Sequence, residues 1–178
     1  DAAADTFPKL LIHHARVRGD RPALRHKDSG IWQTWTWSDM LREVRAIALT
    51  LSALGIRRGD TVAIAGNNRP RLYESILAAQ ALGAIPVPLY ADAIATELAY
   101  VLDHADVTVA VVQDQEQVDK ILSVQEQLPK LKHLVYDETR GLRDYDHSHL
   151  HDLGKLIAQN EALMARDPES AARIDREI

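Results

Sequence analysis

Apolar residues follow two different spacings along most of the chain. Where they recur every three or four positions they predict amphipathic helices, which we place over residues 7–18, 37–54, 70–82, 96–104 and 115–127. Between these segments, short apolar runs rich in β-branched residues predict strands over residues 61–65, 85–89, 107–112 and 134–136. Strands and helices that alternate with short connections predict an α/β fold with a mainly parallel sheet flanked by helices.

A β-hairpin is predicted near the start of the chain. Turn formers at residues 28–30 separate two alternating runs, residues 22–27 and 31–35, which suits two antiparallel strands. The side chain of Thr36 or Ser38 is expected to cap the helix that follows the hairpin, because both hydroxyls precede the first apolar helical positions.

Prolines and a glycine define further boundaries. Pro70 suits the first turn of a helix, and Gly83 is expected to end that helix. Pro86 and Pro88 lack amide protons, so the strand over residues 85–89 is expected at an edge of the sheet.

The organisation changes after Tyr136. Residues 137–152 are predicted to form a polar, acidic and His-rich loop, followed by polar helices over residues 154–166 and 168–178. The last helix ends at Ile178 with no cap, no following strand and little to pack against, so we expect the natural chain to continue. We therefore predict an α/β subdomain over residues 1–136 and a helical extension over residues 137–178.

Composition narrows the class of protein. Hydrophobic residues make up 46% and charged residues 26% of the chain, as in soluble globular proteins, and no apolar run has the length of a membrane span. The absence of Cys excludes disulfides and thiolate chemistry and suits a cytoplasmic location, with peripheral membrane attachment left open. Residues 1–90 carry 12 basic and 8 acidic side chains and residues 91–178 carry 9 and 18, with no basic face for a nucleic acid.

Two segments could carry a binding site. The loop Gly66-Asn67-Asn68-Arg69-Pro70 precedes a helix N-terminus, where a phosphate could bind, but without a glycine-rich motif we favour a connecting loop. His147, His149 and His151 alternate, and in an extended segment their imidazoles would share one side and could bind zinc or nickel. We favour a solvated loop there too, because a metal site needs rigid surroundings.

Other reactive residue types have simpler explanations. None of the serines stands in the Gly-flanked elbow of hydrolases, and Asp137 and Glu138 are expected to be solvated loop charges. Trp32, Trp35 and Trp37 are expected on one face of the hairpin, packed in a core or interface rather than on a ligand. We therefore assign no catalytic, cofactor-binding or metal-binding residue to this chain.

Several stretches resemble the amino-terminal region of long-chain acyl-CoA synthetases and other adenylate-forming enzymes. They are Arg21-Pro22-Ala23-Leu24, Thr34-Trp35-Thr36-Trp37, Gly59-Asp60-Thr61-Val62-Ala63-Ile64, Asn68-Arg69-Pro70 and residues 77–90. Residues 100–105 and 114–122 resemble the fatty-acyl branch in particular. The resemblance runs from about residue 7 to 136 and implies the amino-terminal part of the adenylate-forming, AMP-binding fold.

The resemblance implies a function for the parent protein. Family members couple a carboxylate to ATP, release pyrophosphate and pass the acyl group to CoA, with Mg²⁺ accompanying the nucleotide. The family's Thr/Ser/Gly-rich phosphate loop would follow shortly after Ile178, and its later catalytic segments are also absent, so the fragment itself is expected to bind no cofactor and to be inactive. Its partners would be the remainder of its own chain and a second copy in a homodimer. Arg71, where the family commonly has Glu, and the His-rich loop depart from the family pattern.

One alternative stays open from the sequence. The chain could be a freestanding, non-enzymatic α/β module that binds a protein partner or a metal through its acidic second half. We also expect the isolated chain to expose an apolar sheet face and to self-associate.

Overall fold

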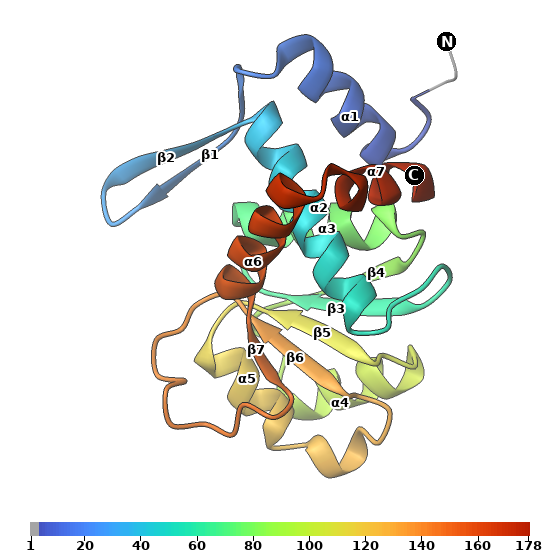
Figure 1. The fold of residues 1–178 in the computed structure, drawn as a ribbon. Coiled ribbons are helices and arrows are strands. Elements are labelled where there is room, and N and C mark those ends of the chain that lie inside the picture. Colours follow the sequence, from blue (N-terminus) through green and yellow to red (C-terminus); the bar gives the residue numbers. More distant parts are fainter. Residues whose placement is uncertain (1–3) are drawn as a thin grey trace.

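The computed structural model describes residues 4–178 and contains a β-hairpin, a five-stranded sheet and helices on both sheet faces (Figure 1). The helices are α1 (Phe7–Arg18), α2 (Trp37–Ala53), α3 (Pro70–Ala81), α4 (Ala95–His104), α5 (Gln115–Leu122), the 3-10 helix η1 (Gln125–Gln127), α6 (Leu153–Arg166) and α7 (Pro168–Glu177). The strands are β1 (Pro22–Asp28), β2 (Ile31–Thr36), β3 (Thr61–Ala65), β4 (Ile85–Leu89), β5 (Val109–Val112), β6 (His133–Tyr136) and β7 (Leu150–Asp152). The predicted α/β class, the parallel sheet and the hairpin are confirmed.

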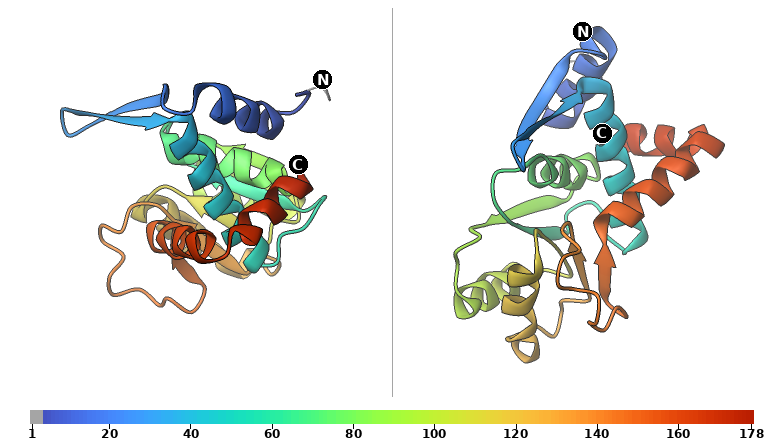
Figure 2. Two further views of the ribbon diagram at one scale, coloured as in Figure 1. Left: turned by 45° about the horizontal axis from the view of Figure 1, so that its top comes forward. Right: turned by 90° about the vertical axis from the view of Figure 1, so that its left-hand side faces the viewer.

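The sheet has the strand order β4-β3-β5-β6-β7, and every neighbouring pair is parallel. After β3 the chain moves to one side to form β4, and then crosses to the other side of β3 to form β5. The direction of winding therefore changes between β3 and β5. The hairpin of β1 and β2 stands apart from this sheet and projects beyond the helices (Figures 1 and 2).

Two apolar clusters cover the two faces of the sheet. Val62 and Ile64 of β3 pack into a cluster with α1, α2, α3, α6 and α7, whereas Ala63 and Ala65 face a cluster with α4 and α5. This alternation is what a strand covered on both faces requires. The expectation of an exposed apolar sheet face is wrong, because β3, β5 and β6 are buried on both sides.

The helix caps agree with the sequence patterns. The Thr36 hydroxyl accepts a hydrogen bond from the Asp39 amide at 3.1 Å, and the Asp39 carboxylate accepts one from the Thr36 amide at 3.0 Å. Thr36, rather than Ser38, is thus the cap of α2, in a reciprocal capping box. At the end of α3, Gly83 has a φ of +67°, a conformation that glycine adopts with little strain.

Strand β4 lies at the edge of the sheet, as its prolines predict. The amide of Ile85 donates to the carbonyl of Asp60, on the side of β3, at 2.8 Å. Because successive amides of a strand point to opposite sides, Pro86 and Pro88 stand where amides would point away from β3. Both missing donors are therefore on the outer side of the edge.

Three boundaries differ from the predictions by more than one residue. Residues 150–152, placed in a loop from the sequence, form β7 because Leu150 is buried and its register pairs it with Leu134 of β6. The helix predicted to reach residue 127 ends at Leu122, where a turn keeps Val124 and Leu128 in the core. Strand β5 begins at residue 109 rather than 107.

The last helix packs firmly, contrary to expectation. Ile174 of α7 is 1% exposed within the first cluster, and Asp175 accepts two hydrogen bonds from Arg45 of α2, at 2.9 and 2.5 Å. Residues 137–178 thus add β7, α6 and α7 to the same sheet and core. The proposed boundary at residue 136 stays a prediction.

The three tryptophans do not share one hairpin face. Trp32 is exposed beneath the guanidinium of Arg25, Trp35 lines a cleft, and Trp37 is the first residue of α2. The prediction was wrong because positions 32 and 35 differ by an odd number, which places them on opposite sides of a strand. Among residues 4–178, no helix has both the length and the apolar composition needed to cross a membrane.

Candidate functional site

The carboxyl ends of β3, β5 and β6 meet where the winding of the sheet changes direction. In open parallel sheets this is the position at which ligands usually bind. The chain continues from these strands into Gly66, Gln113 and Asp137, and the three segments are joined by backbone hydrogen bonds: the Gln113 amide donates to Ala65 at 2.9 Å, and the Asp137 amide donates to Val112 at 3.0 Å. The loops at this edge are therefore fixed relative to one another.

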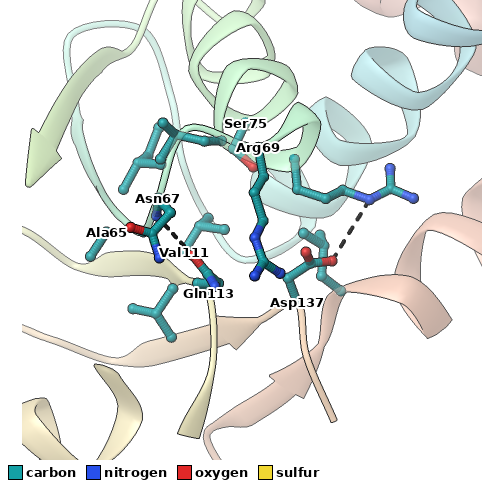
Figure 3. Close-up of a pocket in the computed structure, with 13 residues that line it drawn as sticks. Ala65, Asn67, Arg69, Ser75, Val111, Gln113 and Asp137 are labelled. Carbon is teal, nitrogen blue, oxygen red and sulfur yellow. Dashed lines mark hydrogen bonds and ion pairs between the residues drawn. The ribbon is translucent and has the colours of Figure 1, made fainter. Parts of the chain in front are cut away.

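A chain of polar side chains crosses the edge. The Gln113 Oε1 atom accepts a hydrogen bond from the Asn67 amide at 2.7 Å (Figure 3). The Gln113 Nε2 atom donates to the Glu138 carboxylate at 3.3 Å. That carboxylate also accepts from the guanidinium of Arg69. One glutamine thereby joins the loops that follow β3 and β6.

Gly66 permits the close approach of these loops. A Cβ atom at this position would lie 3.0 Å from the Cβ of Gln113 and 3.2 Å from its Oε1. Since such separations are tighter than ordinary van der Waals contact, the Asn67–Gln113 hydrogen bond depends on glycine here.

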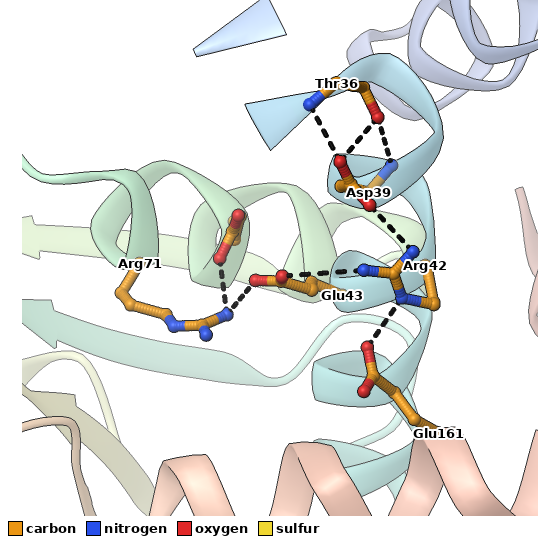
Figure 4. Close-up of polar contacts among 7 residues, drawn as sticks. Thr36, Asp39, Arg42, Glu43, Arg71 and Glu161 are labelled. Atoms are coloured by element: carbon orange, nitrogen blue, oxygen red, sulfur yellow. Dashed lines mark hydrogen bonds and ion pairs between the residues drawn. The ribbon is translucent and has the colours of Figure 1, made fainter. Parts of the chain in front are cut away.

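Arg71, at the start of α3, lies among three carboxylates from three elements. Its guanidinium donates to Glu43 of α2 and, at 2.9 Å, to Glu74 of α3, and its Nε lies 3.7 Å from Asp137 after β6 (Figures 3 and 4). Glu43 continues the network to Arg42, which pairs with Glu161 of α6 at 2.8 Å. The ion pairs therefore connect α2, α3, α6 and the segment that follows β6.

Burial raises the pKa of two carboxyl groups around Arg71, those of Glu74 and Asp137. Glu74 is fully buried, and removal from water, with a further contribution from the nearby Glu43, raises its pKa to about 8 against the opposing effect of Arg71. Burial also raises the pKa of Asp137, again opposed by Arg71. At neutral pH the Glu74 carboxyl is thus mostly protonated, which reduces the excess of negative charge around a single cation.

Two cavities adjoin the network. The inner one, between α3 and the ends of β3 and β5, has a volume of about 20 Å³, which fits no more than about one water molecule. Ser75 lines it, and the buried hydroxyl has no hydrogen-bond partner within residues 4–178. The outer cleft, about 540 Å³, lies between the hairpin and the segment 137–140, and has the size of a small-molecule site.

The charged side chains around residues 66–70 argue against a phosphate site in this loop. Arg69 and Arg71 are both paired with carboxylates, and the four acids around these two cations, Glu43, Glu74, Asp137 and Glu138, outnumber them. The helix N-terminus itself has Arg69 at its cap position with no side-chain capping bond, and Pro70 has no amide to offer. This favours the connecting-loop interpretation, which stays a prediction.

The three histidines of the predicted solvated loop do not lie together. His149 and His151 lie near His133 of β6, with ring centroids 6.0 and 5.1 Å from it, whereas His147 lies beside Tyr136. Within residues 4–178, no group of three His, Cys, Asp or Glu side chains is already arranged around a metal position.

Sequence reasoning missed the Arg71 cluster. Glu74 occupies a position of α3 in line with the buried Pro70 and Ala78, and a carboxylate on the apolar side of a helix is the signal that could have revealed it. Its partners could not be read in the same way, because Glu43 and Asp137 are distant in the sequence.

The fold is that of adenylate-forming enzymes. It matches the solved structure of acetoacetyl-CoA synthetase from Streptomyces lividans with a TM-score of 0.75 and 23% identity, over 85% of this chain and 24% of that one. The model of the family described as "AMP-binding enzyme" matches residues 11–173, so the chain belongs to this family. The resemblance predicted from the sequence is confirmed.

The curated relatives include much longer ligases and short proteins of Mycobacterium tuberculosis. Long-chain-fatty-acid–CoA ligase ACSBG2 of Xenopus laevis is 28% identical over 170 residues, which are 90% of this chain but 23% of that protein. Uncharacterized protein Rv1549 of Mycobacterium tuberculosis is 38% identical over 102 residues, covering 57% of this chain and 58% of that protein. The chain thus spans about a quarter of the ligase and little over half of the short relative.

Proposed function

We propose that this chain is the amino-terminal part of an ATP-dependent long-chain acyl-CoA synthetase, and that it acts as a scaffold without activity of its own. The parent would convert a fatty acid, ATP and CoA to acyl-CoA, AMP and pyrophosphate through an acyl-adenylate, with Mg²⁺ bound to the nucleotide. The observation that carries the proposal is the match to ACSBG2 over 90% of this chain and 23% of that protein, together with the family match over residues 11–173.

The charges and the cavity at the carboxyl ends of β3, β5 and β6 support the scaffold role. The cations there, Arg69 and Arg71, are engaged with carboxylates, and the inner cavity is too small for a nucleotide. The polar network instead holds three loop segments and four elements in a fixed arrangement. The site would position the edge of the sheet for reactive groups supplied by the rest of the parent chain.

Activity measurements test the scaffold role. The purified chain, incubated with ATP, Mg²⁺, palmitate and CoA, is expected to form no acyl-CoA and to catalyse no exchange of pyrophosphate into ATP. Turnover above the rate of a heat-denatured sample would refute the scaffold proposal. The same assay on the full natural reading frame, with acetate and anthranilate as competing acids, tests the long-chain substrate.

A second candidate is a freestanding non-enzymatic module. It is favoured by the relative from Mycobacterium tuberculosis, because 102 residues that make up 58% of that protein mean that it is about as long as this chain. An antibody raised against residues 137–149 and applied to an extract of the source cells distinguishes the two. A band near 19.9 kDa supports the module, and a band several times larger supports the ligase. A homodimer and a location in the cytoplasm stay proposals.

A further inference from the structure

Three histidines, His133, His149 and His151, lie near one another at the amino end of β6 and β7, whereas the polar network described above lies at the carboxyl ends of the strands. Leu134 and Leu150 are paired in register and both turn into the cluster beneath α5. Since successive side chains of a strand point to opposite faces, His133 and His151 project from the other face of the two strands, and the ring of His149, just before β7, lies 6.0 Å from that of His133. The hydrogen bond from the Leu134 amide to the His149 carbonyl, 2.9 Å long, fixes this register.

Two of these imidazoles already lie at the separation of metal ligands. The Nδ1 atom of His133 is 3.1 Å from the Nε2 atom of His151, with the ring planes inclined by 50°. Two nitrogens bound to one tetrahedral zinc, each at about 2.0–2.1 Å, stand roughly 3.3 Å apart. A modest rotation of the rings would therefore direct both lone pairs at one ion.

The imidazole pair is accessible, because His133 and His151 are each only partly buried. The nearby charges are Lys132, which acts on His133, and Asp146, which lies close to His149. His133 and His149 also line a groove of about 610 Å³, which His151 does not line.

We propose that His133 and His151 chelate one divalent transition-metal ion, Zn²⁺, Ni²⁺ or Cu²⁺, between adjacent strands, with water in the remaining positions. On binding, the proton between the two facing nitrogens moves, by way of water, to the other nitrogen of its own ring, so both imidazoles stay neutral and no net proton is released. His149 lies near His133 and is exposed, so its side chain can reach the ion by rotation. His147 takes no part, because its ring lies beside Tyr136. The proposal does not depend on the proposed ligase function.

Calorimetric titration of the chain with Zn²⁺ at about pH 7.5, above the ordinary His pKa, tests this site. We expect one ion per chain in the micromolar range, and about tenfold or greater weakening in His133→Gln and in His151→Gln. His147→Gln is the matched control from the same loop and is expected to bind as the unchanged protein does.

Imidazole signals in NMR spectra provide a second measurement on the same samples. Substoichiometric Cu²⁺ is expected to broaden the ring protons of His133 and His151 before those of His13 and His147. Three results would overturn the proposal: no heat of binding at millimolar Zn²⁺, equal binding by His133→Gln and the unchanged protein, or a loss in His147→Gln as large as in His151→Gln. Circular dichroism of each variant verifies that it is folded.

Discussion

At the residue scale, the most unusual group is Glu74, a carboxyl with no exposed surface beside one shared cation. Arg71 is shared among Glu43, Glu74 and Asp137, and of these three carboxyl groups Glu74 alone has no exposed surface. Burial, with a further contribution from Glu43, raises the pKa of Glu74, and its protonation reduces the negative charge around Arg71. The stability of the fold therefore depends on protonation of Glu74 as well as on the ion pairs of Arg71.

This dependence predicts how stability varies with pH. The folded pKa of Glu74 is about 8 and its ordinary value is 4.5, so the protonated form stabilises the fold fully below 4.5 and the contribution is lost as the pH rises through 8. Glu74→Gln cannot lose a proton, and should gain stability relative to the unchanged protein by up to about 1.4 kcal/mol for each pH unit in this interval. Urea unfolding at several pH values measures the difference.

The exposed Glu126 of η1 supplies the control for that comparison. Glu126→Gln should leave the slope of unfolding free energy against pH unchanged. Parallel slopes for Glu74→Gln and the unchanged protein would show that Glu74 is ionised in the folded state.

At the scale of elements, local signals explain most boundaries and long-range pairing explains the exceptions. Thr36 and Gly83 act through hydrogen bonds and backbone conformation within a few residues, so their effects could be predicted from the sequence. Strand β7 could not, because three residues carry too little pattern and its pairing partner, β6, is separated from it by a long loop. The Arg71 cluster escaped prediction for the same reason, since its carboxylates converge only in the folded sheet.

The capping box of α2 gives a direct test at this scale. Thr36→Ala removes the hydroxyl that accepts from the Asp39 amide, and should lower the free energy of unfolding by about 1 kcal/mol. Ser38→Ala, two residues later, should change it by less than about 0.5 kcal/mol, because the Ser38 contact with Gly19 uses the backbone amide. Chemical denaturation of the two variants distinguishes them, and equal losses would argue against Thr36 as the cap.

At the scale of the whole molecule, segments far apart in the sequence close one core. The two final helices lie against α2, which begins directly after the hairpin (Figure 2). The sequence could not reveal this contact, because α7 is mostly polar and its few buried residues, such as Ser170 and Ile174, make a short pattern. Its docking face was therefore taken for a solvated surface.

Truncation of one buried side chain tests how much α7 contributes. Ile174→Ala should lower the free energy of unfolding by about 2–4 kcal/mol, since Ile174 is 1% exposed and its loss leaves a cavity. The adjacent, exposed Arg173 provides the control, and Arg173→Ala should cost less than about 0.5 kcal/mol. Thermal and urea unfolding measure both, and a cost for Ile174→Ala as small as that of the control would mean that α7 is not docked in solution.

The outward-facing prolines of β4 determine at which edge of the sheet a further strand can pair. A strand arriving from other polypeptide at that margin would find two consecutive donor positions empty, at Pro86 and Pro88, and could not complete a ladder. Extension by backbone pairing is thereby confined to the margin formed by β7, three residues long. Incompletely folded copies of the chain therefore cannot polymerise by pairing at β4. A neighbouring strand can still pair with β7, at the opposite edge of the five-stranded sheet.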